Sequence, residues 1–154
     1  MNVEYINPFI RSTQNTFETM LNLHPKKTGM RIKETPEAIY DVSAVIGLGG
    51  SASGVVTLSF PKEVVLQVVS NFIGEPMRSL NMEVADAVGE LVNMISGGAK
   101  TDLNNMGFNL SLALPNVVMG SDHQIWKKRD VPCVVLDFEC EAGNFAIEVS
   151  LIEK

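Results

Sequence analysis

Hydrophobic residues recur along this chain at two spacings, one typical of helices and the other of strands. Apolar positions three and four apart predict helices at about residues 7–24, 61–73 and 81–105. Asn7 is expected to cap the first helix, with Pro8 and Pro61 each at a first helical position. Shorter apolar or alternating runs, bounded by turn residues, predict strands at about residues 30–34, 40–48, 55–60, 108–114, 131–140 and 145–152.

The order of these elements predicts an α+β fold, an α/β sandwich in which a mainly antiparallel sheet packs against long helices. Each half of the chain contains a long helix followed by three strands, and the helix at 61–73 joins the halves. This outline is consistent with a two-fold internal pseudo-repeat, although no residue-level repeat proves a duplication. The 154 residues suit a single domain spanning 1–154.

The composition, 45% hydrophobic and 19% charged, is typical of a soluble globular protein. No apolar run approaches the roughly 20 residues that a membrane span needs. The first ten residues lack the basic-then-apolar order of a signal peptide. We therefore expect a cytoplasmic location and no membrane partner.

The charge pattern argues against a nucleic-acid partner. The net charge is −6, and the basic cluster Lys127, Lys128 and Arg129 is followed at once by Asp130. Such a cluster is more typical of a solvated loop than of a surface that binds a phosphate backbone.

The cysteines and histidines form no recognisable metal or redox motif. Cys133 and Cys140 fall in one predicted strand at an odd separation, which directs them to opposite faces of a sheet. His24 and His123 are isolated in the sequence. We therefore expect no disulfide and no metal site of the chain's own.

A polar stripe on the third predicted helix is the strongest candidate for chemistry. Asp86, Glu90, Asn93 and Gly97 recur at spacings of four, three and four, so they share one side of the helix. A solvated helix face would explain this periodicity alone. However, glycines also stand at positions 89 and 98, and each mid-helix glycine costs roughly 1 kcal/mol relative to alanine. The opposite side is apolar and should pack on the sheet: Val84, Val88, Leu91, Ile95 and Ala99.

The run Asp86-x-x-x-Glu90-x-x-Asn93-x-x-x-Gly97-Gly98 resembles the signature of the CheC/CheX/FliY family of chemotaxis phosphatases. The opening Glu4-Tyr-Ile-Asn-Pro-Phe and the strand from Gly54 that leads into Pro61 are also similar to CheX, so the resemblance extends over most of the chain. With one convincing motif, the chain is more similar to CheX than to CheC, which carries two.

This resemblance implies a phosphatase that removes the aspartyl phosphate from a CheY-type response regulator. It assigns Asn93 to orienting the attacking water and Glu90 to docking on the regulator's active-site lysine. Asp86, Gly97 and Gly98 would be supporting positions. The resemblance also implies that the chain has no cofactor of its own, that Mg²⁺ is held by the partner receiver domain, and that the chain is a homodimer.

Two other Glu-x-x-Asn pairs occur in the chain, and their contexts differ from that of Glu90 and Asn93. Asn7, after Glu4, precedes a proline and is interpreted as a helix cap, with a vestigial second motif as the alternative. The pair Glu141 and Asn144 falls in a predicted hairpin turn.

Two other function classes compete with the phosphatase hypothesis. A binding module could dock a receiver domain or a flagellar-switch component through the same helix without catalysing dephosphorylation. A self-contained hydrolase of small phosphate esters is disfavoured, because the sequence presents neither a metal cluster nor an activated nucleophile.

Overall fold

The computed structural model describes residues 3–120 and 131–153, which form two layers, one of helices and one of strands. The basic cluster at 127–129, His123 and Trp126 lie outside the described residues. The elements in chain order are α1 (Val3–Thr16), the π-helical turn η1 (Phe17–Leu21), β1 (Lys26–Ile32), β2 (Val42–Gly50), β3 (Ala52–Phe60), α2 (Lys62–Ile73), α3 (Met82–Asn105), β4 (Leu110–Leu112), β5 (Asn116–Met119), β6 (Val134–Cys140) and β7 (Gly143–Glu153).

All strand pairings are antiparallel, in the order β1-β6-β7-β3-β2-β4, with β5 also paired to β2. β3 and β7 lie side by side at the centre. The strand order has an internal two-fold symmetry. It is unchanged when the elements of the two halves are exchanged: α1 with α3, β1 with β5, β2 with β6 and β3 with β7. α2 lies between the two halves in the chain. The α+β class and the helix-plus-three-strands outline are therefore confirmed, with β4 as an addition to the second half.

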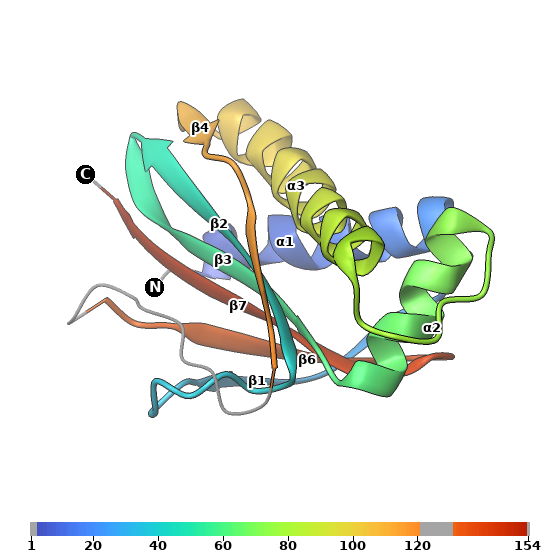
Figure 1. Ribbon diagram of the computed structural model, residues 1–154. Helices are drawn as coiled ribbons and strands as arrows, with labels where there is room; N and C mark the ends of the chain where they lie inside the picture. The colour runs from blue at the N-terminus through green and yellow to red at the C-terminus, as the bar shows by residue number, and fades with distance from the viewer. Residues whose placement is uncertain (1–2, 121–130, 154) are drawn as a thin grey trace.

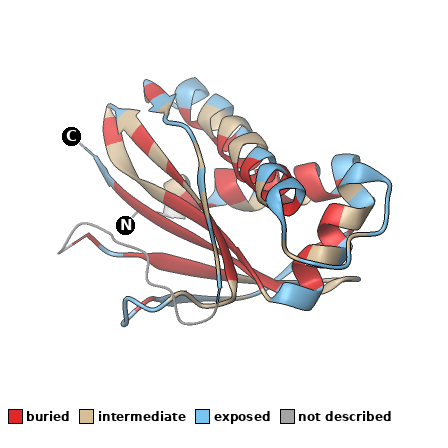
Figure 2. Cartoon of the chain, in the orientation of Figure 1, coloured by how far each residue is buried: buried red, intermediate tan, exposed pale blue. Residues whose placement is uncertain are grey.

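The three helices cover one face of the sheet (Figure 1). The buried positions concentrate on the central strands and on the helix sides that face them (Figure 2). Four phenylalanines from η1, β3, β6 and β7 stack at this junction, with ring centroids 4.5 to 6.4 Å apart: Phe17, Phe60, Phe138 and Phe145. Aromatic rings at such separations add to the stability that their apolar burial supplies.

The helix boundaries follow from local chemistry at α2 and α3. The Asn81 side chain accepts a hydrogen bond from the Val84 N–H, as an N-cap should. Gly74 ends α2 in a left-handed conformation with φ of 82°, which glycine adopts without strain. Pro61 is the N-cap of α2 rather than its first helical residue, one position from the prediction.

The predicted start of the first helix is wrong. α1 begins at Val3, so Asn7 is not a cap and Pro8 lies inside the helix. An internal proline costs roughly 3 kcal/mol, but Ile6, Pro8 and Phe9 are buried against the rest of the chain. Tyr5 also donates a hydrogen bond to Glu153. Tertiary burial therefore outweighs the local signal.

Two strand predictions also need correction. β1 covers Lys26–Ile32 rather than residues 30–34, because its side chains are almost all exposed and leave no hydrophobic pattern. The strand predicted at 108–114 is the short β4, and a further strand, β5, follows Pro115. Proline lacks the N–H that a strand ladder needs, which explains the break.

Cys133 and Cys140 lie on opposite faces of the sheet, as their odd separation predicts. No disulfide joins Cys133 to Cys140. Cys133 lies near Glu148 on the face of the sheet away from the helices, whereas Cys140 packs against the helix-covered core. Among the described helices, none is both long enough and apolar enough to cross a membrane.

Candidate functional site

The orientation of α3 is fixed by its apolar stripe. The five positions predicted to face the sheet are all fully buried: Val84, Val88, Leu91, Ile95 and Ala99. α3 contacts β2 and β3 of the sheet, and it also contacts α1 and α2. Because the helix cannot rotate without exposing this stripe, the opposite side must face outward.

The polar stripe occupies that outward side, as predicted. Asp86 and Glu90 are exposed, and Asn93 and Gly97 are half-buried. Glu90 and Asn93 are three residues apart, so their side chains are neighbours on the helix surface. Neither side chain takes part in a hydrogen bond or ion pair within the described residues. A carboxylate and a carboxamide are therefore available side by side to another molecule.

Gly98 permits the close approach of α1 and α3. A Cβ at this position would lie 2.3 Å from the Ser12 Oγ and 3.2 Å from the Ser12 Cβ. The same Ser12 hydroxyl donates a 2.6 Å hydrogen bond to the carbonyl oxygen of Ile95. The glycine is therefore explained by packing within this chain.

The other two glycines of α3 have different surroundings. A Cβ at Gly97 would meet nothing within 4 Å. A Cβ at Gly89 would make ordinary contacts with Val117 and Pro115, at 3.5 and 3.7 Å. Gly97 is thus the glycine whose missing side chain leaves open space beside Asn93 on the outer surface.

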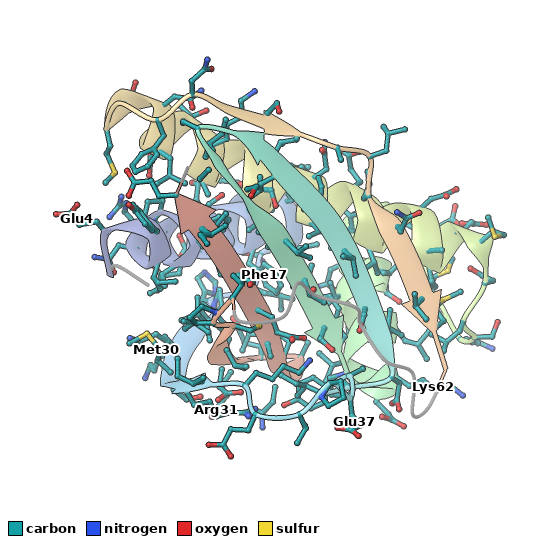
Figure 3. All side chains as sticks on the ribbon, turned by 90° about the vertical axis from the view of Figure 1, so that its left-hand side faces the viewer. Glu4, Phe17, Met30, Arg31, Glu37 and Lys62 are labelled. Atoms are coloured by element: carbon teal, nitrogen blue, oxygen red, sulfur yellow. The ribbon has the colours of Figure 1, made fainter. Side chains whose placement is uncertain are left out.

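The pair Glu4 and Asn7 is the pseudo-symmetric counterpart of Glu90 and Asn93. On α1, Glu4 and Asn7 stand eight and five residues before Ser12. On α3, Glu90 and Asn93 stand eight and five residues before Gly98, which packs against Ser12. Glu4 and Asn7 are exposed on α1, and Glu4 points away from the sheet (Figure 3). The cap interpretation is therefore wrong, and the two helices present similar pairs.

Arg11 distinguishes the two helices. It stands one residue before Ser12, where α3 has Gly97. Its guanidinium pairs with Asp102 of α3, Nη2 lying 3.3 Å from Oδ2. α1 thus carries a long, ion-paired side chain at the position where α3 has a glycine.

The third pair, Glu141 and Asn144, has a structural role, as its turn context predicts. The Glu141 carboxylate accepts the His24 backbone N–H at 2.7 Å and contacts the His24 Nδ1 at 2.6 Å. These hydrogen bonds lower the pKa of Glu141 to about 2 and raise the pKa of His24. Glu141 therefore ties the start of β1 to the β6–β7 turn.

The connection between β4 and β5 flanks the polar stripe and was not expected there. Pro115 and Val117 lie against Gly89 of α3, and the Asn104 side chain accepts a hydrogen bond from the Leu110 N–H. The sequence predicted one strand through residue 114, so this neighbour was missed. Pro115 was the signal that could have revealed the break.

The described residues include no group of three or more histidine, cysteine, aspartate or glutamate side chains that could hold a metal ion. The stripe can offer one carboxylate as a hydrogen-bond acceptor and one carboxamide as both donor and acceptor. Such a pair can position a water or a cationic side chain but supplies no covalent nucleophile.

Comparison with known proteins identifies relatives of this chain. Residues 42–139 match the family described as chemotaxis phosphatase CheX. The chain is 31% identical over 126 residues to the CheY-P phosphatase CheX of Thermotoga maritima, covering 81% of each protein.

Solved structures share the whole fold. A CheC-like superfamily protein from Shewanella sp. PV-4 is 35% identical, with a TM-score of 0.89 and 99% of each chain covered. Chemotaxis protein CheX from Vibrio vulnificus is 37% identical, with a TM-score of 0.88, covering 97% of this chain and 99% of the other.

The adjacent glycines should respond oppositely to alanine. Gly97→Ala should stabilise the protein by up to about 1 kcal/mol, because a helical Cβ is added in open space. Gly98→Ala should destabilise it by roughly 1–3 kcal/mol, because the new methyl group must displace Ser12. Urea unfolding monitored by circular dichroism measures both changes.

The double variant Ser12→Gly with Gly98→Ala provides the control. It should recover much of the stability lost in Gly98→Ala if the clash with Ser12 is the cause. Equal stability of the two single alanine variants would contradict the packing explanation.

Proposed function

The chain belongs to the CheX family of chemotaxis phosphatases, and we propose that it hydrolyses the aspartyl phosphate of a phosphorylated CheY-type response regulator. The observation that carries this proposal is the outward pair of Glu90 and Asn93 on α3, with neither side chain engaged within the described chain. The name of the Thermotoga relative, a CheY-P phosphatase, supports the choice of substrate.

The chemistry of the substrate suits a carboxamide. An aspartyl phosphate is an activated acyl phosphate, so its hydrolysis needs a water held in line with the phosphorus more than it needs a covalent nucleophile. Asn93 can accept from and donate to that water. A carboxylate in its place would bring negative charge towards an anionic phosphoryl group.

Glu90 acts in docking in this proposal. Its carboxylate pairs with the active-site lysine of the receiver, which fixes the register of Asn93 against the phosphoryl group. Glu90 and Asn93 are neighbours on a helix whose opposite side is buried against the sheet. The contact between Glu90 and the lysine therefore also positions Asn93. Glu90 is not assigned the role of a general base.

The remaining motif residues have supporting roles. Asp86 is exposed one turn before Glu90 and extends the acidic stripe. Gly97 leaves the space into which the receiver surface fits. Gly98 has an indirect role, because it lets α1 and α3 pack closely at Ser12.

We propose further that the divalent ion of the reaction is Mg²⁺ held by the receiver's acidic pocket, so the chain needs no metal of its own. The described residues offer no ligand cluster for such an ion. Metal analysis of the chelator-washed protein should find less than stoichiometric zinc, manganese or magnesium. One tightly bound equivalent would overturn this assignment.

Alanine at Asn93 and at Glu90 should separate chemistry from docking. Asn93→Ala should lower single-turnover dephosphorylation of a radiolabelled receiver by two or more powers of ten, on the order expected for a lost positioning group, with little change in binding. Glu90→Ala should weaken receiver binding by roughly 1.5–3 kcal/mol and also slow the reaction. Full turnover by Asn93→Ala would refute the proposed site.

The variant Glu4→Ala with Asn7→Ala is the matched control on the pseudo-symmetric helix. It should keep full turnover per folded molecule, because α1 has the long side chain of Arg11 where α3 has Gly97.

Failure of the unsubstituted chain to accelerate loss of the acyl phosphate would indicate a binding module instead of a phosphatase. Loss of turnover in the folded control variant would place the reaction on α1.

We also propose that the chain forms a homodimer through its β1 edge. β1 pairs with β6 on one side, and the described strands provide no partner for its other side. Two β1 side chains are strongly exposed: Met30, labelled in Figure 3, is 51% exposed, and Ile32 is 58% exposed. A second copy could extend the sheet and cover both side chains.

Light scattering over a dilution series tests the dimer. The mass should be twice the 16.8 kDa of one chain, and Met30→Lys should shift the equilibrium to the monomer because it buries a charge at the new edge pairing. A mass of one chain at high concentration would count against the dimer.

A further inference from the structure

Two strongly exposed hydrophobic side chains flank the polar stripe of α3. Leu114 is 86% exposed and Met82 is 72% exposed, the highest fractions among the large hydrophobic side chains of the described residues. Single exposed hydrophobic residues are common on protein surfaces and need no explanation. Two extreme cases beside the same short polar motif are less easily attributed to chance.

The position of Leu114 follows from its anchored neighbours. The Leu110 N–H donates a 3.1 Å hydrogen bond to the Asn104 side chain, and Val117 contacts the position of Gly89. The segment between these anchors therefore runs antiparallel to α3, alongside its middle turns. Leu114 directly precedes Pro115 on this segment, so its backbone lies beside the turn of α3 that begins at Gly89.

Pro115 holds this part of the chain against α3. Its Cγ atom would lie 3.7 Å from a Cβ at Gly89, and its fixed φ limits the freedom of the connection. Just before it, the Ala113 N–H donates a 3.0 Å hydrogen bond to the Gly47 carbonyl oxygen of β2. Leu114 is thus presented to solvent between two fixed residues.

Met82 extends the same flank towards the start of α3. It lies seven residues before Gly89, nearly two full turns, so both residues face the same side of the helix. The polar stripe is therefore bordered on this side by Met82 at one end and by Leu114 beside its middle.

We propose that Leu114 and Met82 are the apolar anchors by which the protein binds the surface of the phosphorylated receiver around its acyl phosphate. This inference rests on the proposed function and adds the residues that supply affinity. The contact assigned to Glu90 is a single charge-assisted interaction, and it supplies only part of the affinity that a specific complex needs. Interfaces gain most of their affinity from a few well-packed side chains that lose their water on binding, and methionine is enriched among interface residues.

The continuity of the two surfaces identifies the occupant. A receiver that brings its lysine to Glu90 and its phosphoryl group to Asn93 must also cover the adjoining rim, because a specific interface spans about 800 Å² on each partner. Covering that rim with hydrophobic side chains excludes bulk water from the reacting group while leaving the one water held by Asn93.

The test is a binding titration with a CheY-type receiver from the organism that encodes this chain, loaded with Mg²⁺ and beryllofluoride as the phosphoryl mimic. Leu114→Ala and Met82→Ala should each raise the dissociation constant roughly five- to tenfold, on the order of the apolar area removed. In steady-state dephosphorylation they should raise the half-saturating receiver concentration more than they lower the maximal rate.

Two matched controls are available elsewhere on the chain. Met106→Ala truncates an exposed methionine at the other end of α3, and Ile152→Ala truncates an exposed aliphatic side chain on β7; their exposed fractions are 44% and 43%. Both should leave the dissociation constant unchanged.

The outcomes separate this inference from the proposed function. Unchanged binding by Leu114→Ala and Met82→Ala, together with loss of turnover in Asn93→Ala, would overturn the anchors and retain the site. Weakened binding by both variants, with Asn93→Ala fully active, would retain the docking surface and overturn the assigned catalysis. Equal weakening by the Met106 and Ile152 controls would overturn the anchors, because the effect would then not be specific to this flank.

Discussion

Burial of the apolar side of α3 is the constraint on which the functional surface depends. Five fully buried residues hold the helix against the sheet, so its rotation about its own axis is fixed. The same contacts determine which residues face outward. Glu90 and Asn93 are presented by a rigid element whose stability comes from the opposite side, and their side chains need no internal partners to hold the helix in place.

The approach of α1 to α3 adds a second constraint. The Gly98 and Ser12 contact brings the two helices together near the pseudo-two-fold axis, so each helix presents a Glu-x-x-Asn pair in an equivalent place. The two surfaces differ one turn after each pair. Gly97 leaves open space on α3, whereas α1 has Arg11 at the corresponding position, paired with Asp102. A pseudo-symmetric framework thus carries two different surfaces, and the residue one turn after each Glu-x-x-Asn pair is one of the differences.

The site is an open helix face with a hydrophobic border, which suits a macromolecular substrate better than a small one. A small ligand is usually held in a concave pocket that buries most of its surface. A helix face instead gains its specificity when another protein closes over it. In the proposed function one carboxylate and one carboxamide suffice, because the receiver contributes the phosphoryl group, the lysine and the ion.

The orientation of α3 and the ends of two helices could be predicted from the sequence, because they depend on residue periodicity and on local capping signals. The 3.6-residue repeat of α3 identified both its buried and its exposed side, and the Asn81 cap and the Gly74 terminus are local signals that tertiary contacts did not change. The Asp86 to Gly98 signature is likewise a sequence property, and it indicated the family that the comparisons show.

Tertiary structure alone decided the features that depend on contacts between distant segments. The start of α1 was mispredicted because burial of Ile6 and Phe9 outweighs the local preference of Asn7 and Pro8. β1 was misplaced because an exposed edge strand carries no hydrophobic pattern. The different surroundings of Gly97 and Gly98, and the position of Pro115 against Gly89, could not be predicted from residue spacing. Each depends on which residue of another element lies opposite, and that is settled only when the helices and the sheet pack together.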